Sequence, residues 1–307
     1  MIANRPSRTA ELVAAIRAAH LRYDQPAIFE DRFAIDLTSG WWRWIVNTPP
    51  LYRLVTRATG TARARGTFLA RARYTEEKLE SAIRDGIDQY VILGAGLDSF
   101  AWRRRDIACK LRIFEIDHPA SQAAKRCRLQ ELGIPVPENL EFIPVDLDRD
   151  NVAEALARSR YSPDHRGFFS LLGTVQYISR EALVNTLRSI AIIAAPGSEL
   201  VLSYVLPRHL VEPPHLSAYD WGLRFAARQG EPFVSLYDPA ELAAEVCALG
   251  YELLENFSPR DQALRYFVGR TDDLQPSTPL LAHLAHFRVC NLAEPPVYEE
   301  AVNRRKP

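Results

Sequence analysis

Net charge is the first thing that this sequence lacks. Its 307 residues carry 38 lysines and arginines and 38 aspartates and glutamates, so the formal net charge is +0 and the pI lies near 7.1. Proteins dedicated to nucleic acids usually carry a basic excess, and this balance argues against such a partner. Hydrophobic residues still make up 47% of the chain, which is enough for a sizeable core.

Long apolar runs are also missing. No stretch reaches about 18 uninterrupted apolar residues, the length expected of a transmembrane helix. The first residues, MIANRPSRTAELVAAIRAAH, lack the apolar core of a secretory signal. We therefore expect no membrane partner and a cytoplasmic location.

Cysteine is scarce and its spacing is uninformative. The four cysteines, Cys109, Cys127, Cys247 and Cys290, are far apart and form no C-x-x-C pair. This pattern predicts reduced, mostly buried thiols rather than a disulfide framework or a metal site.

What the sequence does contain is a change in the pattern of its apolar residues near residue 84. Up to that point it reads as helical, with Leu12, Ala15, Ile16 and Ala19 at helical spacing. Beyond it, short apolar strands alternate with helical patterns, which indicates a mostly parallel sheet with helices on both faces. The expected strands are 89–93, 111–117, 140–146, 167–173, 198–205, 251–257 and 263–270. The expected helices between them are 119–133, 151–159, 179–197 and 239–250.

A glycine loop follows the first expected strand. Gly94, Ala95 and Gly96 stand where a parallel sheet binds its ligands, beyond the carboxyl end of a strand. Glycine permits a sharp turn and a close approach by a ligand. Glu115 and Asp117 end the second strand, at the distance along the chain where a carboxylate can accept ribose hydroxyls. Asp146 ends the third strand, where we expect adenine.

The residues after the loop indicate which nucleotide is bound. The dinucleotide fingerprint requires a third glycine at position 99, where Ser99 stands, and Asp98 precedes it. A carboxylate at this position would repel a pyrophosphate and suits a ligand with positive charge. S-adenosylmethionine, with its sulfonium and ammonium groups, is such a ligand. Alternatively, Asp98 caps the helix that follows, and the two roles are compatible.

The motifs VILGAGLDSFAWR, FEIDHP with Lys125 following, PVDL and LLGTVQYIS resemble the leucine carboxyl methyltransferase-like family. These are class I S-adenosylmethionine-dependent methyltransferases with a Rossmann-like seven-stranded sheet. The similarity is strongest to their bacterial O-methyltransferases, some of which act on polyketide carboxylates in secondary metabolism. It covers roughly residues 8 to 270, and the GAGLDS and FEID motifs are its more specific part.

The resemblance implies a role for each matching residue. Arg73 would bind the carboxylate of the methionine moiety, with Arg71 as the neighbouring candidate. Gly94, Ala95 and Gly96 would line the methionine part, Asp117 would accept the ribose hydroxyls with Glu115 second, and Asp146 and Leu147 would flank adenine. The protein-modifying eukaryotic members carry a glutamate near the position of Leu172. Its absence disfavours a protein C-terminal leucine as substrate and favours a small molecule.

The acceptor is expected to be a carboxylate. Methyl transfer is an in-line displacement in which the protein mainly aligns the reactants. A carboxylate, with a pKa of about 4, needs no general base, whereas a phenol with a pKa of about 10 benefits from one. The candidate bases are histidines, and a structural role is the favoured interpretation for each of them: His118, His209, His215, His283 and His286. His283 and His286 would share one helical face as a metal pair, but a third ligand is lacking.

Two groups of aromatic residues are expected to cover the carboxyl ends of the strands as an apolar lid. They are Trp41, Trp42 and Trp44 in the N-terminal region, and Tyr219, Trp221 and Phe225 in a stretch from Pro207 to Pro232 that interrupts the alternation. Ordinary packing between cap and sheet would explain them equally well. Tyr204 and Tyr177 are candidates for positioning the acceptor.

The sequence therefore predicts two regions. Residues 1–84 form a helical N-terminal cap, and residues 85–307 form a Rossmann-like methyltransferase domain with an insertion at 207–236 after the fifth strand. The expected ligands are S-adenosylmethionine and a small-molecule acceptor, with no metal and no nucleic acid. The open alternatives are an NAD(P)-binding oxidoreductase and a protein that binds S-adenosylmethionine without turnover. For a methyltransferase, a phenol or a protein C-terminal carboxylate are the alternative acceptors.

Overall fold

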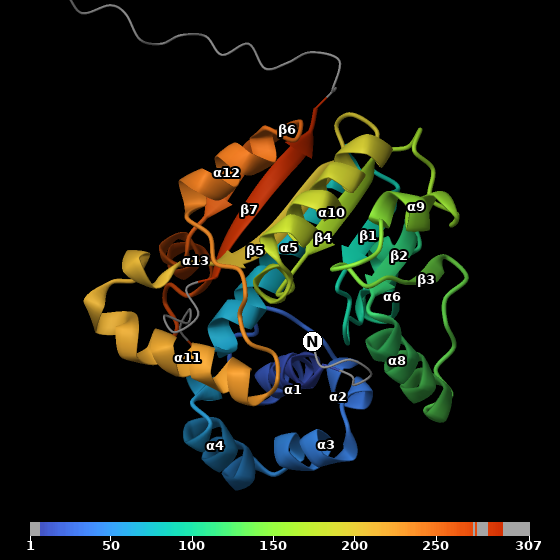
Figure 1. Ribbon diagram of the computed structural model, residues 1–307. Helices are drawn as coiled ribbons and strands as arrows, with labels where there is room; N and C mark the ends of the chain where they lie inside the picture. The colour runs from blue at the N-terminus through green and yellow to red at the C-terminus, as the bar shows by residue number, and fades with distance from the viewer. Residues whose placement is uncertain (1–6, 273, 275–281, 291–307) are drawn as a thin grey trace, which may run out of the picture.

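The protein is built on a single seven-stranded sheet with the strand order β3-β2-β1-β4-β5-β7-β6 (Figure 1). The computed structural model describes residues 7–272, 274 and 282–290. The strands are β1 Gln89–Leu93, β2 Arg112–Asp117, β3 Leu140–Pro144, β4 Gly167–Leu171, β5 Glu199–Val205, β6 Tyr251–Phe257 and β7 Ala282–Val289. β7 alone among these strands runs antiparallel to its two neighbours. The expected α/β, Rossmann-like fold is confirmed.

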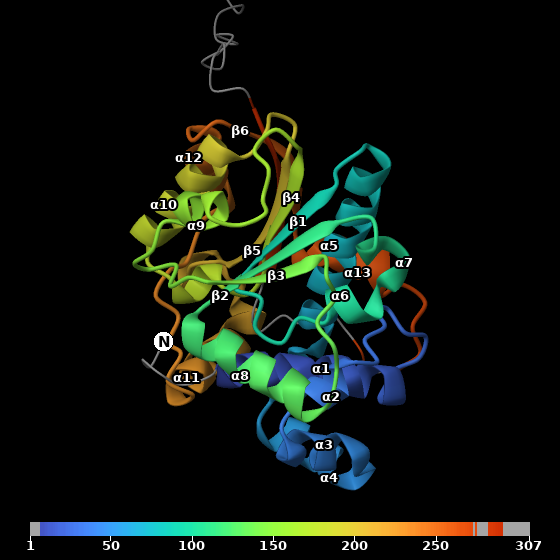
Figure 2. The ribbon, with the colours of Figure 1, turned by 90° about the vertical axis from the view of Figure 1, so that its right-hand side faces the viewer.

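Helices cover both faces of the sheet, because its central strands are apolar on both sides (Figure 2). Val91 and Leu93 of β1 belong to one core cluster, and Tyr90 and Ile92 to the other. The first face carries α9 Val152–Ala157, α10 Arg180–Ile193 and α12 Pro239–Cys247. The second carries α5 Arg65–Arg84, α6 Phe100–Arg103, α7 Arg105–Ala108, α8 Pro119–Glu131 and α13 Pro259–Tyr266.

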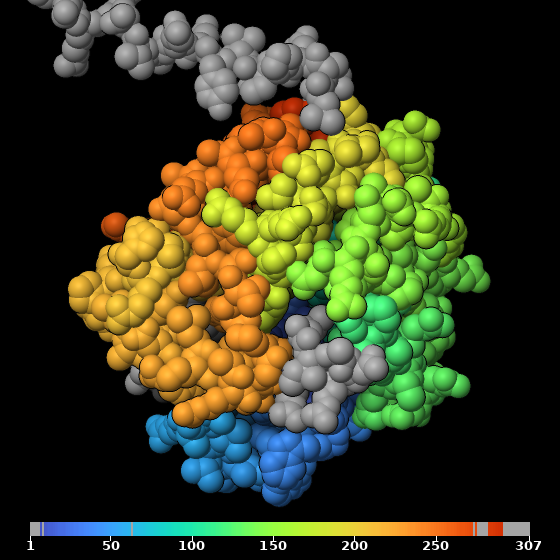
Figure 3. Space-filling view, in the orientation of Figure 1, coloured from blue at the N-terminus to red at the C-terminus, as the bar shows by residue number. Residues whose placement is uncertain are grey.

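The N-terminal helices and the insertion lie beyond the carboxyl ends of the parallel strands (Figures 1 and 3). The N-terminal elements are α1 Arg8–Tyr23, α2 Ala34–Leu37, α3 Gly40–Asn47, α4 Pro49–Ala58 and η1 Thr61–Arg63. The later elements here are η2 Val175–Tyr177, η3 Arg208–Leu210, η4 Pro213–His215 and α11 Leu216–Arg228. Helix α5 belongs to both regions, since it follows the cap directly and packs Leu79 and Ala82 into the sheet core. Residues 291–307 of the expected second region lie outside the described residues.

The seventh strand is not where the sequence pattern placed it. The stretch 263–270 was expected to be a strand, but α13 extends to Tyr266 and a turn follows it. The cause is local: Ser258 and Asp261 form a capping box and Pro259 occupies the first turn, so a helix starts here. Strand β7 instead contains His283 and His286, which were expected on a helix.

Two further observations bear on the sequence-based expectations. The four cysteines are free, but Cys109, Cys127 and Cys290 are exposed, so the expectation of mostly buried thiols is wrong. Across residues 7–272, 274 and 282–290, no helix combines the length and the apolar composition needed to cross a bilayer.

Candidate functional site

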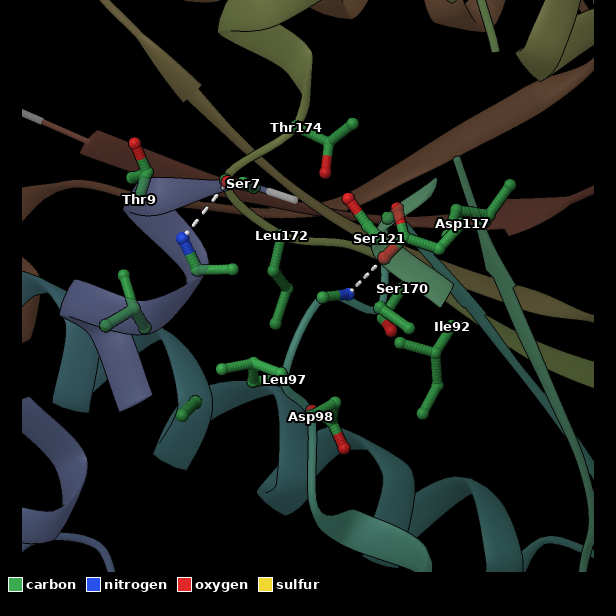
Figure 4. A pocket seen from close by; sticks show the side chains of 18 of the residues that line it. Ser7, Thr9, Ile92, Leu97, Asp98, Asp117, Ser121, Ser170, Leu172 and Thr174 are labelled. Carbon is green, nitrogen blue, oxygen red and sulfur yellow. Dashed lines mark hydrogen bonds between the residues drawn. The ribbon is translucent and has the colours of Figure 1, made fainter. Parts of the chain in front are cut away.

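A cavity lies where the carboxyl ends of β1, β2, β3 and β4 meet the cap (Figure 4). The floor is formed by residues within these strands and directly after them, and the opposite wall comes from α1, α5 and the end of the insertion. In Figure 4, Ser7 and Thr9 approach from α1, while Asp98 and Asp117 lie on the strand side. The cavity therefore joins segments that are more than 200 residues apart, such as Thr9 and Glu231.

The glycine loop forms the centre of the floor. Gly94 and Gly96 have φ angles of +69° and +50°, which favour glycine, and the Gly94 and Ala95 N–H groups donate to the Ile116 carbonyl at 2.8 and 3.2 Å. A Cβ on Gly94 would lie 2.1 Å from Thr174 Oγ1. The loop is therefore held tightly between β2 and the segment after β4, and its three residues line the cavity.

Asp117 is the best-positioned carboxylate of the site. It ends β2 and lines the cavity, and its Oδ2 and Oδ1 accept hydrogen bonds from the N–H groups of Gly96 and His118, both at 2.7 Å. Burial raises its pKa, while these two backbone hydrogen bonds act in the opposite direction. The same carboxylate oxygens have remaining lone pairs with which to accept hydroxyl groups of a ligand.

Asp98, Asp146 and Leu147 also line the cavity. Asp98 Oδ1 accepts a hydrogen bond from the N–H group of Phe100 at 2.7 Å, so the carboxylate caps the turn that follows and faces the cavity at the same time. Asp146 and Leu147 follow β3, and Asp146 Oδ2 lies 4.0 Å from His118 Nε2. The three carboxylates Asp98, Asp117 and Asp146 give this side of the cavity a negative character.

The structure places Arg71, and not Arg73, in the cavity. Arg73 is exposed, forms an ion pair with Glu77 at 2.8 Å and is not part of the lining. The reason is helical geometry: two residues along α5 turn the side chain by about 200°. Of the two arginines expected as candidates for the methionine carboxylate, Arg71 therefore lies in the cavity and Arg73 does not.

Arg71 has the properties of a binding group rather than of a structural one. Its guanidinium lies over the Phe68 ring at 4.9 Å and comes within 2.5 Å of the point where a Cβ on Gly173 would lie. No carboxylate of the described residues forms an ion pair with it, and burial lowers its pKa to about 10. A cation in the wall of a cavity without an acidic partner is suited to an anionic group of a ligand.

Glu115 does not reach the cavity. Its carboxylate is 1% exposed and pairs with Lys125 Nζ at 2.5 Å. It stands two residues before the end of β2, about 6.6 Å further back along the strand, and therefore lies beneath the floor. Burial raises the pKa of Glu115, and the Lys125 ammonium opposes this effect. The secondary ribose role expected for Glu115 is thus replaced by a structural one.

The two tyrosine candidates have different positions. Tyr177 lines the cavity, whereas Tyr204 is buried outside it and donates a hydrogen bond to Asn256 Oδ1 at 3.0 Å. Burial raises the pKa of Tyr177 to about 12, so this hydroxyl is protonated near neutral pH. Tyr204 is therefore excluded as a residue that contacts a ligand of this cavity, while Tyr177 is retained.

The expected aromatic lid is not observed as a lining. None of its six members lines the cavity. Trp41 and Trp44 are exposed, Trp42 packs within the cap, and Trp221 stacks on Phe225 at 5.1 Å. The aromatic residues that do line it are Phe29, Phe68, Tyr90, Phe100 and Tyr177, together with the aliphatic side chains of Val13, Ile92, Leu172 and Ile178.

The histidines are distributed over the molecule. His118 lines the cavity, where its Nδ1 accepts a hydrogen bond from the Ala120 N–H group at 3.2 Å. His209 and His215 lie on η3 and η4 outside the lining. His283 and His286, three residues apart on β7, point to opposite faces of the sheet and cannot share a metal. Among the described residues, no three His, Cys, Asp or Glu side chains gather as a metal-ligand set.

A polar cluster at the cap side was missed by the sequence analysis. Thr9 donates a hydrogen bond to Glu231, which is buried and lines the cavity together with Tyr177. Glu231 belongs to a segment without a recognisable motif. The sequence pointed to Glu231 only indirectly, because this residue lies in the stretch from Pro207 to Pro232 that we expected near the ligand-binding edge of the sheet.

Comparisons with known proteins point to one family. A family model described as leucine carboxyl methyltransferase matches residues 10–191, a range that contains Arg71, the glycine loop, Asp117 and Asp146. A protein of Bacillus subtilis (strain 168) with the name "Putative S-adenosyl-L-methionine-dependent methyltransferase YktD" is 31% identical over 288 residues. The match covers 88% of this chain and 94% of the relative.

Two solved structures share the fold over nearly the whole chain. A DUF574 family protein from Streptomyces avermitilis MA-4680 gives a TM-score of 0.62 at 15% identity, and the match covers 94% of this chain and 100% of the other. A protein from Thermobifida fusca YX, named a "putative methyltransferase", gives a TM-score of 0.56 at 15% identity, covering 94% and 97%. At this level of identity the similarity concerns the fold alone.

Proposed function

This chain belongs to the leucine carboxyl methyltransferase family of S-adenosylmethionine-dependent methyltransferases, and we propose that it methylates a carboxylate of an apolar small molecule. The observation that carries the proposal is the cavity itself. It brings together an arginine that forms no ion pair with the described residues, a glycine loop that lines the cavity and a carboxylate with free lone pairs.

The residues of the cavity fit S-adenosylmethionine part by part. Arg71 would bind the methionine carboxylate, and the backbone of Gly94, Ala95 and Gly96 would lie along the methionine chain. Asp98 offers a negative charge to the ammonium group. The remaining partners are Asp117 for the ribose hydroxyls and Asp146 and Leu147 for adenine. When bound, S-adenosylmethionine supplies a methyl group that is already activated by the sulfonium.

The negative side of the cavity also argues against a dinucleotide. Asp98 and Asp117 both line the space around the glycine loop, and a pyrophosphate placed there would be repelled by their charges. The third glycine of the dinucleotide motif is absent, because position 99 is a serine. Ser99 is buried and accepts a hydrogen bond from Arg103 at 3.2 Å. These observations disfavour the NAD(P)-binding oxidoreductase.

The chain's own contribution to the reaction would be alignment and exclusion of water. Apolar side chains from α1, α5 and the segment after β4 surround the part of the cavity next to the cap, which suits an apolar acceptor; they include Val13, Phe68, Leu172 and Ile178. Tyr177, protonated near neutral pH, can donate a hydrogen bond to an acceptor oxygen and hold it in line. A carboxylate acceptor is already ionised and needs no base.

A hydroxyl acceptor is the alternative that is compatible with the geometry of the cavity. It would require a base, and the Glu231 carboxylate beside Tyr177 occupies a suitable position. The same carboxylate would disfavour an acidic acceptor placed directly against it. The variant Glu231→Gln therefore distinguishes the two acceptors, because it removes a base without emptying the space.

Two experiments test the proposal, first one on ligand binding and then one on turnover. Titration calorimetry should show binding of S-adenosylhomocysteine and none of NADH, and Asp117→Asn should weaken the former by about 10- to 150-fold, the range of a charge-assisted hydrogen bond of about 1.5–3 kcal/mol. Turnover is then measured with methyl-labelled S-adenosylmethionine and a panel of apolar acids and phenols. A labelled product that mild alkali cleaves supports an ester.

Each contrary result has a definite meaning. Binding of NADH with no affinity for S-adenosylhomocysteine would overturn the methyltransferase. Binding of S-adenosylhomocysteine without transfer to any member of the panel would favour a protein that binds without turnover. An alkali-stable product would replace the carboxylate by a hydroxyl acceptor and leave the methyltransferase in place.

A further inference from the structure

The helical hairpin formed by α3 and α4, residues 40–58, projects from the end of the molecule that is farthest from β6 and α12 (Figures 1 and 2). It is attached to the cap on one side. Ile45, Val46 and Tyr52 pack against Ala15 and Ala19 of α1. Its remaining sides face solvent, and the space-filling view shows the hairpin as the convex lower tip of the protein (Figure 3).

This tip exposes large apolar side chains. Trp41 is 61% exposed, Trp44 is 54% exposed, and Leu54 on the neighbouring helix is 65% exposed. The two indole rings lie 5.3 Å apart. Neither tryptophan takes part in the cavity, so the proposed methyl transfer does not explain them. Exposed apolar side chains gathered on one projection mark an interaction surface.

The charge of the hairpin is entirely of one sign. Residues 40–58 contain no acidic residue and three arginines: Arg43, Arg53 and Arg57. The chain as a whole is neutral, so this segment is a marked local excess. Arg53 and Arg57 of α4 are exposed, and among the described residues neither forms an ion pair. Their charges are therefore available to an anionic partner.

Contrary to the sequence-based expectation of no membrane partner, we propose that the α3–α4 hairpin docks on the surface of an anionic lipid bilayer. Tryptophan is suited to the boundary between headgroups and acyl chains, because its ring is apolar and its N–H group can remain hydrated. Arginines on the same element bind anionic headgroups. A convex tip can insert its outermost side chains into this boundary, as interfacial helices do, whereas a protein partner would need a concave surface to match it.

Vesicle sedimentation with the full-length protein tests this surface. The protein should sediment with vesicles of phosphatidylcholine and phosphatidylglycerol, and much less with phosphatidylcholine alone. Arg53→Gln/Arg57→Gln should lower the partition coefficient by roughly 5-fold for each arginine. Trp41→Ser/Trp44→Ser should lower it further, and higher salt should weaken binding because the attraction is screened.

Matched controls exist elsewhere on the surface. Leu264→Ser/Val268→Ser removes two apolar side chains that are 65% and 75% exposed, and Arg105→Gln/Arg188→Gln removes two exposed arginines. Both control variants should sediment like the unaltered protein. The proposal is overturned if the unaltered protein does not sediment with anionic vesicles, which would leave an acidic protein as the partner of this tip. It is also overturned if the controls lose as much binding as the hairpin variants.

Discussion

At the scale of single residues, the site is decided by where side chains point within one turn of a helix. Arg71 and Arg73 are two positions apart in the stretch RARY, residues 71–74, and the sequence alone allows either of them to bind the methionine carboxylate. In the structure, Arg71 faces the cavity and forms no ion pair with any described residue, while Arg73 is exposed and paired with Glu77. The two arginines are therefore natural test and control for the same function.

Arg71→Ala should weaken S-adenosylhomocysteine binding by about 10-fold or more, since a charge-assisted interaction of at least about 1.5 kcal/mol is lost. Binding of 5′-methylthioadenosine, which has no amino-acid carboxylate, should change little. Arg73→Ala should leave both affinities unchanged. Titration calorimetry with the two ligands measures this, and equal losses for both ligands in Arg71→Ala would contradict the assigned role.

The buried pair of Glu115 and Lys125 gives a second prediction at this scale. Lys125→Met should lower the free energy of unfolding by about 3–5 kcal/mol, because it leaves an unpaired buried carboxylate. Burial already raises the pKa of Glu115 in the unaltered protein, and loss of the ammonium should raise it further, so the folded state of the variant holds the additional proton up to a higher pH. The variant should therefore lose stability as the pH rises from about 5 to 8.

Urea unfolding of the variant at the two pH values measures this effect. The double variant Glu115→Gln/Lys125→Met serves as the control, because it has no buried charge left. It should recover part of the stability and lose the pH dependence that Glu115 contributes. An equal loss in both variants, with no difference in pH dependence, would mean that the charge of Glu115 is not what matters.

At the scale of elements, the loop between β1 and α6 shows how backbone conformation and packing combine. Gly94 and Gly133 have similar φ angles, +69° and +63°, but different surroundings. A Cβ on Gly94 would collide with Thr174, whereas a Cβ on Gly133, at the end of α8, would meet nothing within 4 Å. Comparing the two glycines separates conformational strain from crowding in the cavity.

Gly133→Ala should cost about 1–2 kcal/mol, the strain of a left-handed residue with a Cβ. Gly94→Ala should cost more, and it should also abolish measurable binding of S-adenosylhomocysteine because the loop must shift. Urea unfolding gives the stabilities and calorimetry gives the affinities. Normal affinity in a folded Gly94→Ala protein would show that the ligand does not depend on this loop.

At the scale of the whole molecule, the cavity joins the cap, the sheet and the insertion, and the acceptor chemistry depends on all three. If the acceptor is a carboxylate, the single-turnover rate of methyl transfer should be nearly constant from about pH 6 to 9, because the nucleophile is ionised throughout. Tyr177 should not introduce a transition in this range, since its pKa is raised to about 12. Glu231→Gln should keep this flat profile.

A hydroxyl acceptor predicts the opposite behaviour. With Glu231 as its base, the Glu231→Gln variant should lose most of its rate, and the remaining rate should rise about tenfold per pH unit towards the pKa of a phenol near 10. Thr9→Val removes the hydrogen bond to Glu231 but keeps the carboxylate, and it shows how far positioning alone contributes. The two acceptors are thus separated by the rate and by its slope with pH.

The sequence by itself determined the alternation of strands and helices, the glycine loop, the carboxylate that ends β2 and the carboxylate that follows β3. These features are local: apolar runs, turn residues and a motif of a few neighbouring positions suffice to define them. Arg71, Glu231, Thr9 and β7 were decided only by the tertiary structure. Helix orientation selects Arg71 over Arg73, and Thr9 meets Glu231 only because the chain returns to α1 after 222 residues. The position of β7 depends on pairing with β5 and β6, and such long-range contacts have no signature in a local pattern.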